Sequence, residues 1–198
     1  DGRYAVTATT DDALADTGVA VAPDPQVVFT ADPYEGYQWA LDNTGHNLDR
    51  TDGPPPQRAD ADIDGREAAS TRGAGVVVAV VDSGADMEHP DLSAARWTNS
   101  DESCNNGTDD DHNGYVDDCR GWDFGNEDNQ PYAAGSPDHA THVAGIIAAQ
   151  PGNGIGMAGI APAVSIMNLS VAGPGGMTVS SVARAVRYAV DNGADVVN

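Results

Sequence analysis

Residues 76–82 read VVVAVVD, and this apolar run ending in an aspartate decides the fold of the chain. A strand that is apolar on both faces is typical of the centre of a parallel sheet, where helices cover both sides. Polar residues at the carboxyl ends of such strands gather at the edge where substrates bind. The run therefore predicts a buried parallel strand that delivers Asp82 to a functional edge.

Helical periodicity follows this strand twice. The first helix is expected to begin at His139, with an apolar stripe formed by Val143, Ala144, Ile146 and Ile147. The second is expected to end at Asn192-Gly193, with a stripe formed by Val179, Val182, Ala183, Val186 and Val190. Each stripe predicts the helix face that packs against the core.

Two further strands are expected, over residues 164–169 and 194–198. The order strand–helix–strand–helix–strand predicts right-handed crossovers and an α/β fold, a parallel sheet with helices on both faces. Residues 93–138 contain no long periodic segment and are expected to form a loop region or insertion. Residues 31–75 are polar and rich in turns, and should be mostly coil, with one short helix near Ile63–Ser70 capped by Asp62 or Asp64.

The chain is strongly acidic. Its 198 residues include 31 acidic and 9 basic side chains, which gives a formal net charge of −22, and every basic residue is an arginine. Such a field repels nucleic acid and anionic membranes, so neither is expected as a partner. No run of about 18 apolar residues is present, so no membrane span is expected. The charge suits calcium binding or solubility at high salt, and an acidic extracellular surface without either role is the open alternative.

Two cysteines, Cys104 and Cys119, flank a polar and acidic stretch. Two lone cysteines at this spacing predict one disulfide that closes a small loop, and hence an oxidising, extracellular compartment. Two free thiols are the alternative. The chain begins at Asp1 without a methionine, as a processed or trimmed protein would.

Residues 109–118 read DDDHNGYVDD and match D-x-D-x-N-G, the front of an EF-hand-type loop. Alternate side chains of this pattern converge on one side of a tight turn, and hard oxygen ligands at this density favour Ca²⁺. The twelfth position is Arg120 rather than glutamate, so the loop is not a full EF-hand, and a solvated acidic loop is the alternative. The expected ligands are Asp109, Asp111, Asn113, the carbonyl of Tyr115, and Asp117 or Asp118.

Four strings in the right order resemble the subtilisin-like serine proteases (subtilases, peptidase family S8). The aspartate motif of that family is similar to VAVVDSGAD at 78–86 followed by HPDL at 89–92, and the histidine motif is similar to HATHVAGIIAA at 139–149. The next family loop resembles GIGMAGIAP at 154–162, and the lead-in to the substrate-binding strand resembles NGADVVN at 192–198. The resemblance implies the N-terminal portion of a subtilase catalytic domain over 31–198, with a fold that is incomplete in this chain.

The resemblance assigns Asp82 as the acid that orients the catalytic histidine and His139 as the general base. His142, three residues further along the helix, is interpreted as a hydrogen-bonded structural histidine that lies deeper. A zinc site at His139-x-x-His142 is disfavoured, because it would need a third ligand and a water-activating carboxylate, and no glutamate lies between the histidines.

The chain departs from the family pattern at two points. Ala140 stands where the family usually has glycine, and a helix should tolerate its extra methyl group. No serine stands in a Gly-Thr-Ser-Met-Ala-type string, and the oxyanion asparagine is absent as well. The serine is therefore expected in a C-terminal part that is missing or forms a second chain, and this fragment alone is expected to be inactive.

The resemblance also implies a second calcium site, formed by Asp91 and the loop around Asn153. Residues 1–30 are expected to be an N-terminal extension or the remnant of an inhibitory propeptide. The resulting hypothesis is a secreted serine endopeptidase that acts on proteins or peptides, with Ca²⁺ as its cofactor and a propeptide as a possible inhibitor. The competing hypothesis is a non-catalytic calcium-binding or scaffolding module with the same fold.

Overall fold

A computed structural model of the chain describes residues 32–34, 37–38, 40–41, 63, 65, 71–133 and 136–198. The segment 1–30, expected to be an extension or propeptide remnant, lies outside the described residues. Most of the helix expected near residues 63–70 lies outside them too.

The main sheet has four parallel strands in the order β2-β3-β1-β6. At its centre, β1 (Val77–Asp82) pairs along its whole length with β3 (Ser165–Ser170), so that Asp82 lies beside Ser170 at the carboxyl edge. The flanking strands are β2 (Gly121–Asp123) and β6 (Val196–Val197). The expected parallel α/β arrangement is confirmed, and it brings the carboxyl ends of β1 and β3 to one edge.

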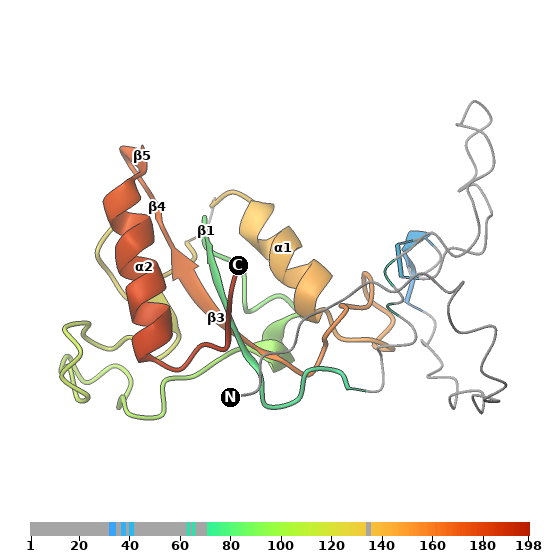
Figure 1. The fold of residues 1–198 in the computed structure, drawn as a ribbon, viewed down its shortest axis with the longest axis horizontal. Coiled ribbons are helices and arrows are strands. Elements are labelled where there is room, and N and C mark those ends of the chain that lie inside the picture. The colour runs from blue at the N-terminus through green and yellow to red at the C-terminus, as the bar shows by residue number, and fades with distance from the viewer. Residues whose placement is uncertain are drawn as a thin grey trace, which may run out of the picture.

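One helix covers each face of this sheet (Figure 1). Helix α1 (His139–Ala148) packs on one face and α2 (Val179–Asp191) on the other. Successive residues of β1 face opposite helices, since Val78 and Val80 join the α1 cluster while Ala79 joins the α2 cluster. This alternation is why the strand is apolar at every position.

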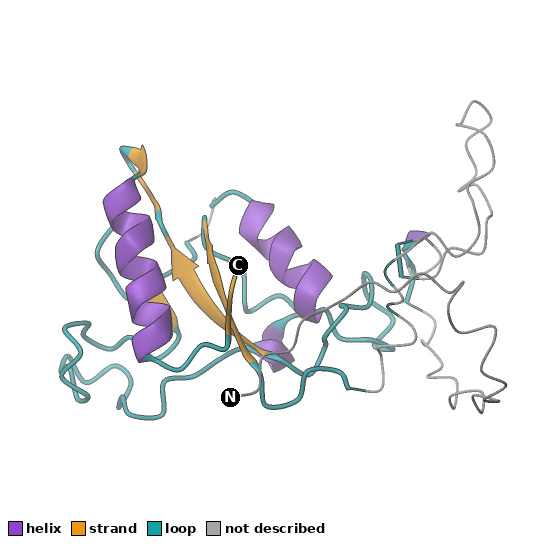
Figure 2. Ribbon diagram, in the orientation of Figure 1, coloured by secondary structure: helices purple, strands orange, loops and turns teal. Residues whose placement is uncertain are grey.

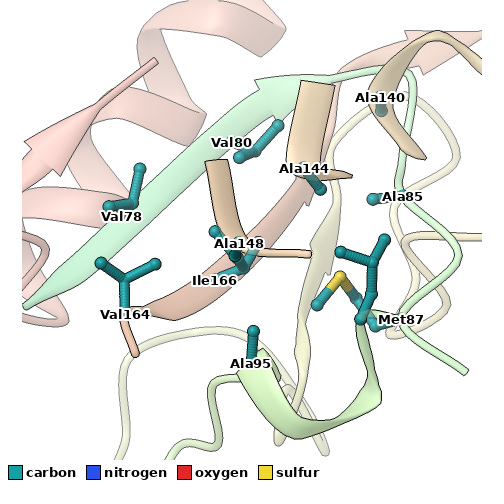
Figure 3. Packing of buried hydrophobic residues seen from close by; sticks show 11 residues of the cluster. Val78, Val80, Ala85, Met87, Ala95, Ala140, Ala144, Ala148, Val164 and Ile166 are labelled. Atoms are coloured by element: carbon teal, nitrogen blue, oxygen red, sulfur yellow. The ribbon is translucent and has the colours of Figure 1, made fainter. Parts of the chain in front are cut away.

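The α1 face is packed with small and β-branched side chains (Figure 3). Fully buried alanines on α1 let the helix approach β1 and β3 closely. The predicted stripe is only partly correct, because Ala144 is buried while Ile146 is 49% exposed. The cluster comprises Val78, Val80, Ala85, Met87, Leu92, Ala95, Ala140, Ala144, Ala148, Val164 and Ile166.

The valine stripe predicted as the packing face of α2 is wrong. Val179 is 89% exposed, Val190 61%, and Val182 and Val186 38% each. The buried face of the helix instead carries Ser181, Ala185, Tyr188 and Ala189. Alanines allow a closer approach to the sheet than valines would, and the Tyr188 hydroxyl donates to Asp118 in the loop that precedes β2. The helix begins with a capping box, in which Thr178 and Ser181 each bond the other's backbone.

The region 93–138 is mostly loop, as expected, but it also contains a strand that periodicity missed (Figure 2). β2 has only three residues, too few for an alternating pattern. A short antiparallel pair, β4 (Ala172–Gly173) and β5 (Gly176–Met177), was also not expected, and it connects β3 to α2.

Candidate active site

The carboxyl edge of the sheet carries a paired aspartate and histidine. Asp82 is the last residue of β1, and His139 is the first residue of α1. Nδ1 of His139 lies 2.9 Å from Oδ1 of Asp82, although the two residues are 57 apart in sequence. The Asp82 side chain is 15% exposed and that of His139 is 71% exposed, so the ring is fixed by the carboxylate and reachable from outside.

The start of α1 is docked onto the loop that follows β1. The backbone N–H of Asp86 donates to Oγ1 of Thr141 at 2.9 Å, in the first turn of the helix. On the sheet side, Asn168 of β3 brackets Ala85: its Nδ2 donates to the Ala85 carbonyl, and its Oδ1 accepts the Ala85 N–H. These links place the helix start relative to the strand end, and therefore place His139 relative to Asp82.

The glycine in the Asp-Ser-Gly turn is required by geometry. Gly84 has a φ of +86°, and a Cβ built there would lie 1.7 Å from the carbonyl oxygen of Pro131. No side chain fits such an approach. Gly84 thus lets the segment before α1 close over the turn that holds Asp82.

Partial burial by itself would raise the pKa of Asp82, but hydrogen bonds from His139 and Ser83 outweigh it and hold that pKa below its ordinary value of 3.8. The Ser83 N–H donates to Oδ1 of Asp82 at 2.6 Å. Asp82 is therefore a carboxylate at neutral pH. With the ring proton on Nδ1, His139 donates to Asp82 and leaves Nε2 free to accept a proton.

Ala140 and His142, the two residues that the sequence analysis singled out near His139, lie on different sides of α1. Ala140 is fully buried in the α1 cluster, so its methyl group packs in the core rather than in an open cleft. His142 is exposed, and within the described part of the chain its side chain makes no hydrogen bond, so the expected buried, hydrogen-bonded role is wrong here. Its position on the exposed side of α1 explains this.

A second polar site lies in the loop before β2, residues 99–119, which we call the acidic loop. Its expected disulfide between Cys104 and Cys119 is confirmed. Oxygens of Glu102, Asp109 and Asp111 lie within 4.8 Å of one another. Two of these three residues were predicted as ligands.

Glu102 was missed by the sequence analysis and is the most informative residue of the acidic loop. It is 8% exposed. Its Oε1 accepts the N–H groups of Asp110 and Asp111, but its buried Oε2 has no partner. Buried polar atoms are almost always satisfied, so an orphaned carboxylate oxygen beside two aspartates fits a cation with hard oxygen ligands. The predicted disulfide could have pointed to Glu102, because a bond between Cys104 and Cys119 holds residue 102 close to the D-x-D-x-N-G segment.

The other predicted ligands are Asn113, Tyr115, Asp117 and Asp118, and they differ in whether they contact the three carboxylates. Nδ2 of Asn113 donates to Oδ2 of Asp111 and to Oδ2 of Asp118, so Asn113 and Asp118 adjoin the cluster. Asp117 turns away, and both of its oxygens accept backbone N–H groups, from Asn106 and Gly107. The backbone carbonyl of Tyr115 stays a predicted ligand, while its ring packs edge-on against Trp122 in the α2 cluster, with centroids 5.1 Å apart.

The residues expected for the second calcium site also come together. Nδ2 of Asn153 donates to Oδ1 of the buried Asp91 at 2.8 Å. Asp32, which the sequence analysis did not single out, is also buried and accepts the N–H groups of Gly152 and Gly154 from the same loop. Two buried carboxylates thus organise the loop that follows α1.

The chain belongs to the subtilase family, whose model matches residues 73–198. The thermophilic serine proteinase of Bacillus sp. (strain AK1) is 32% identical over 168 residues, covering 83% of this chain and 31% of that protein. Thermitase of Thermoactinomyces vulgaris is 35% identical over 127 residues, or 64% of this chain and 37% of thermitase. The halolysin-like extracellular serine protease Nep of Natrialba magadii is 32% identical over 124 residues, or 62% of this chain and 20% of that protein.

A solved structure supports the same assignment. The Aeromonas sobria serine protease, in complex with a chaperone, superposes with a TM-score of 0.58 and 25% identity, covering 84% of this chain and 24% of that chain. The chain therefore spans between a fifth and about two fifths of the length of these four proteins. Among the described residues, no helix has the length and apolar character needed to cross a bilayer.

Proposed function

We propose that the protein is a serine endopeptidase in which Asp82 orients His139 and His139 acts as the general base. The observation that carries this proposal is the 2.9 Å contact between Oδ1 of Asp82 and Nδ1 of His139 at the carboxyl edge of a subtilase sheet. The substrates are proteins or peptides, and the bond cleaved is the peptide bond.

His139 has two tasks in this mechanism. Its Nε2 accepts the proton of a serine hydroxyl as that oxygen attacks the scissile carbonyl, and it then returns the proton to the leaving amine. Asp82 keeps the other nitrogen protonated and stabilises the imidazolium that forms. The serine string is absent from these 198 residues. The proposal therefore assigns the nucleophile and its oxyanion donors to a further part of the protein or a separate chain, without which the fragment is inactive.

Ca²⁺ is proposed as a structural cofactor. The acidic loop would hold it through Glu102, Asp109 and Asp111, with Asn113 beside them, and a bound cation would offset the repulsion between these carboxylates. Asp91 and Asn153, with Asp32, form the second candidate site. Neither site contributes a group to the Asp82–His139 pair.

The protein is proposed to be secreted. A disulfide within the acidic loop fits an oxidising compartment, and one of the relatives is described as extracellular. An inhibitory propeptide or a chaperone is a reasonable partner, since the Aeromonas protease was solved with a chaperone.

A non-catalytic calcium-binding scaffold is the second candidate function. The observation that favours it is the acidic loop with its orphaned Glu102 oxygen, which would serve such a role without any serine. It would use the same fold and leave the Asp82–His139 pair idle.

Active-site labelling separates the two candidates. The complete protein, including whatever polypeptide carries the serine string, is treated with a fluorophosphonate probe. The protease proposal expects labelling that is lost in a His139→Ala variant and kept in a His142→Ala variant. A complete, folded protein that never labels would favour the scaffold.

A further inference from the structure

Asp118 joins the acidic loop to α2. It is fully buried, and three side chains donate to its two oxygens. Nδ2 of Asn99 donates to Oδ1 at 2.9 Å, and Nδ2 of Asn113 donates to Oδ2 at 2.8 Å, both from the acidic loop. The third donor is the hydroxyl of Tyr188, 2.6 Å from Oδ2, which comes from the last turn of α2.

The position of the Tyr188 hydroxyl is fixed by packing. Tyr188 is 2% exposed. Its ring meets Tyr115 edge-on, with centroids 5.1 Å apart, and Phe124 at 5.8 Å. Tyr115 belongs to the acidic loop and Phe124 follows β2, so the ring packs the helix, the loop and the sheet edge together and fixes where Asp118 lies relative to α2.

Asp118 in turn fixes the positions of two side-chain amides, which also bond to Asp111 in the acidic loop. Nδ2 of Asn99 and Nδ2 of Asn113 each donate a second time, to Oδ2 of Asp111, at 3.0 and 2.9 Å. Asp111 is one of the three carboxylates whose oxygens converge with Glu102 and Asp109. An unbroken chain of hydrogen bonds therefore leads from Tyr188 through Asp118 and the two amides to Asp111.

We infer that Tyr188 is a positioning residue for the cation site of the acidic loop, and that cation binding there is coupled to the docking of α2 on the sheet. The inference rests on the calcium site proposed above. Groups that orient metal ligands from outside affect affinity nearly as much as some ligands do. Coupling is reciprocal, so whatever steadies the loop for the ion must also steady the helix when the ion binds.

The test compares two changes that each remove one phenol hydroxyl, one at Tyr188 and one at Tyr132, outside the acidic loop. Calcium binding to the full chain is followed by isothermal titration calorimetry, with Glu102→Gln identifying the binding event that belongs to the acidic loop. Tyr188→Phe should weaken that event about tenfold. The control, Tyr132→Phe, should change it by less than about twofold, because Tyr132 lies outside the acidic loop and the Tyr188–Asp118 bond is untouched.

The outcomes are distinct. Calcium binding that Glu102→Gln weakens but Tyr188→Phe leaves unchanged would overturn the role of Tyr188 while leaving the calcium site standing. If the wild-type chain shows no calcium binding that depends on Glu102, the calcium site itself fails and the inference with it.

A second measurement needs no variant and covers the case in which Tyr188→Phe does not fold. Amide hydrogen exchange of the wild-type chain is measured with Ca²⁺ and with chelator. Ca²⁺ should slow amide exchange in α2 around Tyr188. Equal protection of α2 in both conditions would overturn the coupling.

Discussion

The Asp82–His139 pair and the acidic loop are two polar sites built by different means. The pair is carried by the end of β1 and the start of α1, so regular elements set its geometry. The acidic loop contains no helix or strand over residues 99–118, and it is held by a disulfide and by side chains that bond its own backbone. Several of its residues, such as Asn105 and His112, even take left-handed backbone angles. The pair therefore depends on the whole domain, whereas the loop depends on local links and on one long-range bond, from Tyr188 of α2 to Asp118.

The largest expected effect lies at the pair. In the complete enzyme, Asp82→Asn should lower kcat about 10⁴-fold, because the amide favours the wrong tautomer of His139. Steady-state kinetics on a peptide substrate would measure this. The matched control is Asp86→Asn, four residues away, which should cost little. Calcium affinity of the acidic loop should not change in either variant, and a drop of less than tenfold for Asp82→Asn would contradict the assigned role.

The next effect lies at the loop. Replacing both half-cystines, Cys104→Ser with Cys119→Ser, should lower the free energy of unfolding by about 3 kcal/mol, the chain-entropy value for a loop of this size. Urea unfolding in the presence of Ca²⁺ would measure it. If the Asp82–His139 pair is independent of the acidic loop, the kinetic constants of the variant that remains folded should stay close to those of the wild type. A large loss of kcat in the folded variant would show that the geometry of the Asp82–His139 pair depends on the acidic loop.

Within the loop, Glu102→Gln should weaken calcium binding about tenfold or more, since it removes one charge from a buried oxygen that has no other partner. Chelation should likewise lower the Tm of the wild-type protein and have less effect on the variant. Asp101→Asn is the control, because it removes the same charge from an exposed neighbour. Equal affinities in the two variants would place the ion elsewhere.

The smallest effect tests a link between α2 and the segment after β2. Arg184 donates to both carboxylate oxygens of Glu127, and this ion pair holds the pKa of Glu127 below its ordinary value of 4.5. Both side chains are exposed, so Glu127→Gln should cost only about 0.5 kcal/mol at neutral pH. Because folding lowers the pKa of Glu127, its ionised form stabilises the folded protein at pH values above the ordinary pKa. This stabilisation is lost as the pH falls through the lower pKa of the folded state. The difference between wild type and Glu127→Gln in urea unfolding should therefore vanish well below pH 4.5. A difference that grows in acid would contradict this sign.

The main features of the fold followed from the sequence because long apolar runs carry an unambiguous period. β1 and β3 lie within one or two residues of the expected ranges, α1 begins at His139 as expected, and α2 ends directly before the expected Asn192-Gly193. The buried face of α2 did not follow, because helical spacing fits both the valine stripe and the alanine and tyrosine stripe. Only the distance between helix and sheet, which small side chains shorten, decides between them. β2 was missed because three residues show no period.

The two sites were predictable to different degrees. Asp82 ends a strand and His139 begins a helix, so topology alone brings them to one edge. The D-x-D-x-N-G pattern pointed to Asp109 and Asp111, but Glu102 and Tyr188 enter from outside the pattern. Glu102 is held near the two aspartates by the disulfide. Tyr188 reaches the loop through the packing of α2, and it lies 70 residues from its partner Asp118 in sequence. No local pattern encodes such contacts.

The exposed valine face of α2 also governs how copies of this chain meet in solution. A net charge of −22 keeps molecules apart at low ionic strength, where the Debye length is about 30 Å at 0.01 M. At 1 M salt that length falls to about 3 Å, while the apolar face is unchanged. Attraction between valine faces is then no longer opposed, so the osmotic second virial coefficient should pass from positive to negative as salt is added. The same acidic surface that disperses the chain in dilute buffer would thus stop shielding the four valines of α2 and the other exposed apolar side chains.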